Sequence, residues 1–86
     1  MASPAPPVAA AAVPAADRVL QVLAVLARQG RPLTAAELIA HTGLTRSTLY
    51  RQLARLRRWG FVIEREGSYA PGPLSLQMAL GFDLAS

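Results

Sequence analysis

T-A-A-E-L-I-A-H-T-G-L-T-R-S-T-L-Y-R-Q-L-A-R-L, from Thr34 to Leu56, contains the starts of two helices with a glycine between them. Thr34 is followed three positions later by Glu37, and this T-x-x-E spacing is typical of a capping box at a helix N-terminus. Gly43 tolerates the left-handed conformation that ends many helices, and Thr45 then offers its hydroxyl as the next N-cap. We therefore predict a helix-turn-helix, with a short first helix and a longer second one.

The second predicted helix, from about Thr45 to Arg58, separates leucine from arginine. Its apolar positions fall on one face, at i, i+4 and i+7: Leu49, Leu53 and Leu56. Five of the nine arginines lie between Arg46 and Arg58, and no acid from Thr45 to Phe61 neutralises them. A face of one sign suits contact with phosphates. We predict a recognition helix in the major groove of double-stranded DNA, the alternative being a solvated surface helix.

The predicted DNA contacts differ in role along this helix. Ser47 and Thr48 are small, so the helix N-terminus can approach a phosphate or a base edge closely. Arg46 and Arg51 are candidates for base reading, because an arginine can bond both O6 and N7 of guanine. The later arginines are predicted to contact phosphates or to remain solvated. The full predicted DNA-binding set is Thr45, Arg46, Ser47, Thr48, Tyr50, Arg51, Arg55, Arg58 and Arg65.

Three aromatic residues near this helix have structural interpretations. We favour packing of the Tyr50 ring on the preceding helix, and the alternative is a hydrogen bond from its hydroxyl to a phosphate. Trp59 and Phe61 are predicted to lie in the core.

A short β-hairpin, or wing, is predicted after the arginine-rich helix. The strand formers at 61–63 and the segment 68–70 are separated by a Glu-Gly turn signal at 66–67, and Pro71 ends the second strand. Arg65 lies near the tip, where it can reach a phosphate or the minor groove. An acid on each side of Arg65 opposes this contact, so both outcomes stay open.

Helices are also predicted at both ends of this region. Apolar residues recur at helical spacing from about Ala15 to Gln29, and Val22 and Val25 face either the core or a second copy of the chain. Pro73 can begin a last helix that is richer in leucine than a surface helix should be.

The predicted fold class is mainly α with a small β-hairpin. We divide the chain into a disordered Ala/Pro-rich tail (1–14), a winged helix-turn-helix domain (15–73) and a linker helix (74–86).

Composition excludes several classes of protein. The chain has no cysteine, hence no disulfide framework, and its one histidine, His41, has no partners for a metal site. Five acids, one histidine and no glycine-rich phosphate loop leave no nucleophile paired with a base, so we predict neither an enzyme nor a cofactor. With no apolar run of about 20 residues and no signal peptide, we expect a soluble, cytoplasmic protein.

From Asp17 to Leu76 the chain resembles the N-terminal DNA-binding domain of the isocitrate lyase regulator (IclR) family of bacterial transcription factors. The matching segments are D-R-V-L-Q-V-L-A-V-L, L-T-A-A-E-L-I-A-H-T-G-L, R-S-T-L-Y-R-Q-L-A-R-L, W-G-F-V and S-Y-A-P-G-P-L. The resemblance implies a winged helix-turn-helix in which Arg51 is the arginine of an S-T-x-x-R pattern. It also implies a homodimer on a palindromic operator, with the first helix contributing to pairing.

The chain departs from the family pattern in two places. The family usually has Leu-Gly after the wing tyrosine, where this chain has Ala70-Pro71-Gly72, so the exit from the strand is expected to differ. Family members normally continue into a domain that binds a small-molecule effector, whereas this sequence ends at Ser86. We expect a fragment of a longer regulator, the alternative being a free-standing DNA-binding domain. A winged-helix protein-interaction adaptor that does not bind DNA is the rival function.

Overall fold

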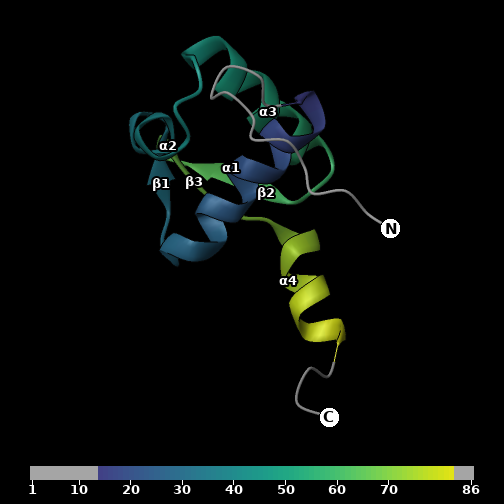
Figure 1. Cartoon of the computed structure of the whole chain (residues 1–86). Helices are drawn as coiled ribbons and strands as arrows, with labels where there is room; N and C mark the ends of the chain where they lie inside the picture. Colours follow the sequence, from purple (N-terminus) through teal and green to yellow (C-terminus); the bar gives the residue numbers. More distant parts are fainter. Residues whose placement is uncertain (1–13, 83–86) are drawn as a thin grey trace, which may run out of the picture.

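Three helices form the centre of the protein, and a small sheet lies against them (Figure 1). The computed structural model describes residues 14–82. The helices are α1 (Ala15–Gln29), α2 (Ala35–Thr42) and α3 (Arg46–Arg58), and α4 (Pro73–Gly81) follows the sheet. The strands are β1 (Leu33–Thr34), β2 (Val62–Arg65) and β3 (Ser68–Pro71), in the antiparallel order β1-β3-β2. This arrangement confirms the predicted winged helix-turn-helix.

The two helices of the helix-turn-helix begin at threonine caps, as predicted. Thr34 Oγ1 accepts from the Glu37 amide at 3.2 Å, and Glu37 Oε1 accepts from the Thr34 amide at 3.0 Å, which completes the capping box of α2. Thr45 Oγ1 accepts from the Thr48 amide at 3.3 Å at the start of α3. Gly43 ends α2 with φ 72°, a backbone conformation that side chains with a Cβ rarely adopt.

The core forms where the apolar faces of the helices meet the inner face of the sheet. Val22 is fully buried and Val25 is half-buried against the same cluster, so the structure places both in the core of the domain. The predicted leucine face of α3 is confirmed, because all three of its leucines are buried. The buried apolar residues are Val22, Leu26, Leu33, Ala35, Leu38, Leu49, Leu53, Leu56, Val62 and Tyr69.

The sheet contains one strand more than the predicted hairpin. β1 pairs with β3 through Leu33 opposite Tyr69 and Thr34 opposite Ser68. Its two residues are too few to show an alternating pattern, so no local signal predicts it. Leu33 and Tyr69 are both buried. This short strand therefore ties the start of α2 to the wing.

The prediction that Trp59 lies in the core is wrong. Its side chain is 69% exposed, whereas Phe61 is half-buried against the core. Trp59 is the residue at which α3 ends, three positions beyond Leu56, so its side chain leaves from the flank of α3 that borders α1. Gly60, with φ 83°, then turns the chain so that the next two residues point inward.

The exit from β3 lies directly on the segment that joins α3 to β2. The Gly72 amide donates to Phe61 O at 2.7 Å and the Leu74 amide donates to Gly60 O at 2.9 Å. A Cβ at position 72 would lie 2.5 Å from Gly60 O, so this close backbone approach requires glycine. α4 buries none of its residues and extends away from the three-helix core (Figure 1). Within residues 14–82, no helix is long and apolar enough to cross a membrane.

Candidate nucleic-acid interface

The outer face of α3 carries exposed arginine and serine. Leu49, Leu53 and Leu56 are buried beneath the helix, and the opposite positions, Ser47, Arg51 and Arg58, are exposed. Arg46, in the first turn, is exposed as well. The protein's own packing therefore leaves the two predicted base-reading arginines accessible.

The first turn of α3 is organised by three hydroxyl groups. Thr45 Oγ1 donates to Thr48 Oγ1 at 2.9 Å and also accepts from the Thr48 amide. Ser47 Oγ lies 3.5 Å from Thr45 Oγ1. Thr45 and Thr48 are therefore already engaged in capping, while Ser47 stands exposed at the tip of the helix. Of the three hydroxyl groups, that of Ser47 is the most available to bind a ligand.

Arg55 lies one turn after Arg51, on the flank of α3 that faces α1. Its Nη1 donates to Gln52 Oε1 at 3.0 Å, and Gln52 is only 1% exposed. Sequence reasoning overlooked Gln52, although its position three residues after Leu49 places it on the leucine face. This buried amide holds the guanidinium of Arg55 against the side of α3.

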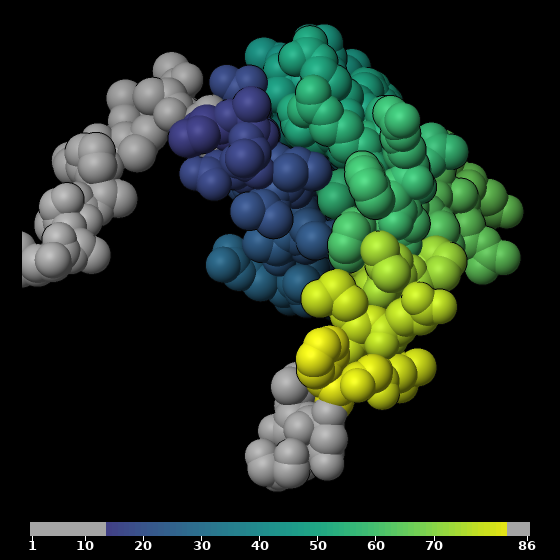
Figure 2. Space-filling model, turned by 90° about the vertical axis from the view of Figure 1, so that its right-hand side faces the viewer, coloured from purple at the N-terminus to yellow at the C-terminus, as the bar shows by residue number. Residues whose placement is uncertain are grey.

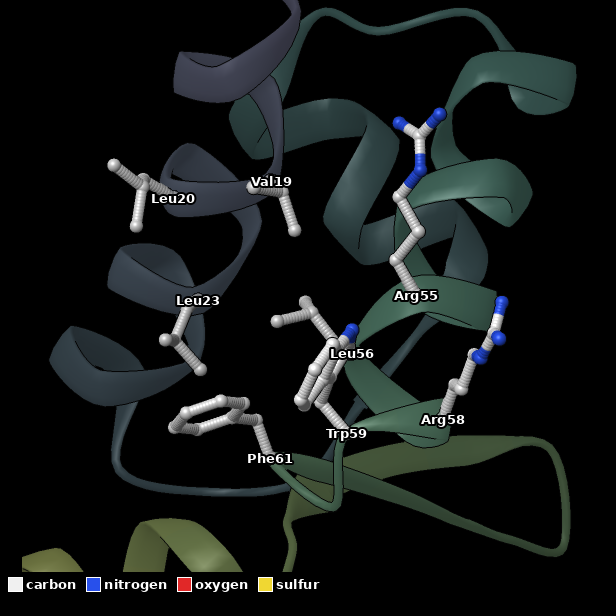
Figure 3. Close-up of a pocket in the computed structure, with 8 residues that line it drawn as sticks. All are labelled: Val19, Leu20, Leu23, Arg55, Leu56, Arg58, Trp59 and Phe61. Atoms are coloured by element: carbon white, nitrogen blue, oxygen red, sulfur yellow. The ribbon is translucent and has the colours of Figure 1, made fainter.

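An apolar groove of about 510 Å³ runs between α1 and the end of α3. Figure 3 shows Leu23 and Phe61 with the Trp59 ring at this groove, while the guanidinium groups of Arg55 and Arg58 point away from it. Leu20, 59% exposed, lies on its α1 side. The arginines therefore supply the aliphatic rim of the groove and keep their charge in solvent.

The arginines of α3 are not unopposed, which corrects the expectation from their local sequence. Arg57 Nη1 lies 3.3 Å from Glu64 Oε1, which β2 presents from the wing. The local sequence around Arg57 does not predict this ion pair, because the pair forms only when the wing packs against α3. The flank of α3 that faces the wing is thus partly neutralised.

Two tyrosines lie near this ion pair. Tyr50 is 44% exposed, so any packing on α2 leaves part of its ring in solvent, accessible to a phosphate. Tyr69 is buried, and burial raises the pKa of its phenol; the charge of Glu64 adds to the rise and that of Arg57 opposes it. The pKa of Tyr69 therefore depends on both Glu64 and Arg57.

Arg65 stands exposed at the end of β2, next to the turn of the wing. Side chains alternate along a strand, so Arg65 and Glu64 point to opposite faces of the sheet. Within residues 14–82, no salt bridge joins Arg65 to either neighbouring glutamate. Its DNA contact remains a prediction.

Known proteins share this domain. The IclR helix-turn-helix domain model matches residues 15–66. The repressor BlcR of Agobacterium tumefaciens is 34% identical with a TM-score of 0.66, over 80% of this chain and 28% of BlcR. HmgR of Pseudomonas aeruginosa is 25% identical with a TM-score of 0.72, over 80% of this chain and 29% of HmgR.

A regulator of Silicibacter sp. TM1040 assigned to the same family is 26% identical with a TM-score of 0.70, over 79% of this chain and 27% of its own. This chain therefore spans less than a third of the length of these three proteins. Among curated protein sequences, none matches it. The domain match covers more than half of the chain and agrees with the winged fold and the basic helix, and the chain belongs to the IclR helix-turn-helix family.

Proposed function

We propose that this domain binds double-stranded DNA at specific sequences and regulates transcription, with α3 in the major groove. The observation that carries the proposal is the outer face of α3, where Ser47 and Arg51 are exposed directly opposite a buried leucine face. A helix anchored in this way can enter a groove about 12 Å wide without disturbing the core. Family membership supports the same function.

The positions of the side chains suggest different roles. Arg51 and Arg46 are proposed to read bases, and Ser47 permits close approach of the helix N-terminus to the DNA. Arg58, about two turns after Arg51, is proposed to bind a phosphate, and Arg65 would contact the backbone or minor groove beside it. Thr45, Thr48, Tyr50 and Arg55 complete the proposed interface, with the two threonines also serving as caps.

A dimer on a palindromic operator is also part of the proposal. Two copies of α3 reading one face of B-DNA need half-sites about 34 Å apart or a multiple of that spacing. The exposed Leu20 on α1 is available for pairing. Residues 15–73 are the proposed DNA-binding unit, with the helix beyond them as a linker.

The test first uses the parent chain to select duplexes from a random pool at low salt. The binding of Arg51→Ala and of Arg58→Ala to the selected duplexes is then compared. Arg51→Ala should lose about 1 to 3 kcal/mol of preference for the selected site over random DNA. Arg58→Ala should weaken binding to all duplexes alike, and the slope of log affinity against log salt should flatten by about 0.9.

Arg28→Ala provides the matched control, because Arg28 is an exposed arginine in the last turn of α1 rather than on α3. Arg28→Ala loses one positive charge, as the two α3 variants do, but it should bind every duplex as tightly as the parent chain does. If Arg51→Ala and Arg58→Ala both bound duplexes as the parent chain does, the arginine face of α3 would have no part in DNA binding.

A protein-interaction adaptor is the second candidate, favoured by the exposed apolar residues of and after α4. These are Leu76, Met78, Leu80 and Phe82, which are 54 to 87% exposed. An adaptor would associate through them with little dependence on salt and would not be retained on DNA at low salt. Retention of the parent chain on duplexes would reject this candidate.

A further inference from the structure

Glu64 extends from the wing toward the helix proposed to bind DNA. Side chains two positions apart on a strand share a face, so Glu64 lies on the same face of β2 as the buried Val62. That face is turned toward α3, and Glu64 Oε1 lies 3.3 Å from Arg57 Nη1. The side chains are 36% and 51% exposed, so ions and ligands can reach both.

The other acids of the described residues stand in different surroundings. Glu37 is bound by Arg31 at 2.8 Å and by the α2 cap, and Asp17 lies in the first turn of α1. Glu66 lies at the turn of the wing, and no salt bridge is formed by it within residues 14–82. Glu64 is thus the acid in contact with an arginine of α3.

The wing does not depend on this pair for its position. β2 is hydrogen-bonded to β3 along four register pairs, and Val62 and Tyr69 are buried beneath the strands. An exposed ion pair adds little to stability beside such packing. The main effect of Glu64 is therefore on the charge that α3 presents.

We propose that Glu64 competes with DNA phosphates for Arg57 and so lowers the affinity of the domain for duplexes of every sequence. The inference rests on the proposed function. A phosphate that approaches Arg57 must displace the carboxylate or share the guanidinium with it, and it is repelled by the carboxylate in either case. Because Arg57 lies on the flank facing the wing, apart from Arg51, Glu64 sets overall affinity and leaves sequence preference to Arg51.

Glu64→Gln tests the proposal because it removes the charge and keeps the shape of the side chain. Releasing one arginine for one phosphate contact should tighten binding roughly five- to tenfold at about 0.1 M salt and steepen the salt slope by about 0.9. The gain should be equal on the selected site and on random duplexes. Unchanged or weaker binding would overturn the inference.

Two further variants identify the cause of the gain. Glu66→Gln makes the same charge change on the wing without touching Arg57, and it should tighten binding by less than about twofold. In an Arg57→Ala background, Glu64→Gln should have no effect. If Glu66→Gln raised the affinity for duplexes equally, or if Glu64→Gln still raised it in the Arg57→Ala background, the cause would be the change in net charge. Either result would overturn the inference.

The outcome also separates the two proposals. Circular dichroism melts of each variant would establish that it is folded before binding is measured. A folded parent chain that no duplex retains at low salt would overturn the proposed function together with this inference. A parent that binds DNA while folded Glu64→Gln binds no more tightly would overturn the inference alone.

Discussion

Leu53 and Trp59 show how strongly the position on α3 decides what a side chain contributes. Leu53 is 1% exposed and lies in the core, whereas the larger Trp59, six positions later, is 69% exposed. Burial stabilises a fold in proportion to the apolar area removed from water. The leucine should therefore matter more to stability than the tryptophan.

We expect Leu53→Ala to lower the free energy of unfolding by about 2 to 5 kcal/mol, because it leaves a cavity in the core. Trp59→Ala should lower it by less than about 1 kcal/mol, as is usual for a surface position. Urea denaturation followed by far-ultraviolet circular dichroism measures both. A larger loss for Trp59→Ala than for Leu53→Ala would contradict the exposed placement of the tryptophan.

At the scale of elements, α2 shows how a local signal sets a helix boundary. Arg31 Nη2 donates to Glu37 Oε2 at 2.8 Å while Glu37 Oε1 accepts from the Thr34 amide. The hydrogen bond from Arg31, then that from the backbone of Thr34, lowers the pKa of Glu37 from 4.5 to about 2. The ionised carboxylate is therefore favoured in the folded state.

This depressed pKa makes the stability of the domain dependent on pH. Between pH 4.5 and about 2 the unfolded chain binds the proton more tightly, so the contribution of Glu37 is complete above pH 4.5 and is lost as pH falls toward 2. The difference in unfolding free energy between parent and Glu37→Gln should shrink over that range. Denaturation at a series of pH values measures it.

Arg31→Gln is the control for this effect, since it removes the cationic donor and leaves the cap of α2 in place. In that background the change in unfolding free energy caused by Glu37→Gln should vary less with pH. An unaltered pH dependence would show that Arg31 is not the main cause. Solvent screening of this exposed pair keeps the whole effect modest.

The elements predicted from sequence are those with local signals. The bounds of α1 and α2 were predicted correctly from the spacing of apolar residues, a capping box and glycine stops. β1 was missed, because Leu33 becomes a strand residue only when Tyr69, 36 positions later, lies opposite it. Such pairing follows from the folded topology and leaves no local pattern.

The same distinction applies to the candidate interface. The leucine and arginine faces of α3 follow from helical periodicity, so the exposure of Arg51 could be predicted. The Arg57–Glu64 pair could not, because α3 and the wing must first pack together. The core prediction for Trp59 failed because the end of α3 directs its side chain outward.

In the whole molecule, α4 extends away from the three-helix core, and within residues 14–82 only its first turn is hydrogen-bonded to the segment after α3. Figure 2 shows α1 and α3 together on one face, with α4 (yellow) below them. An apolar groove of about 440 Å³ separates α4 from α1, lined among others by Leu23, Met78 and Phe82. Because no residue of α4 is buried, the three-helix core should fold without it.

We therefore expect Ala79→Pro to disrupt the end of α4 while changing the free energy of unfolding by less than about 1 kcal/mol. The equivalent Ala27→Pro, at an exposed position in α1, should cost about 3 kcal/mol or more. Circular dichroism would report the lost helix, and urea denaturation would report stability. A cooperative loss of stability in Ala79→Pro would show that α4 is integral to the core.

The exposure of Trp59 has a practical consequence, because it is the one tryptophan among the 86 residues. Its side chain is 69% exposed at the end of α3, beside Arg58 and the groove to α1. Its fluorescence therefore serves as a built-in optical reporter of whatever occupies that edge of the helix. A duplex or partner chain that binds there should change its emission, without any attached dye.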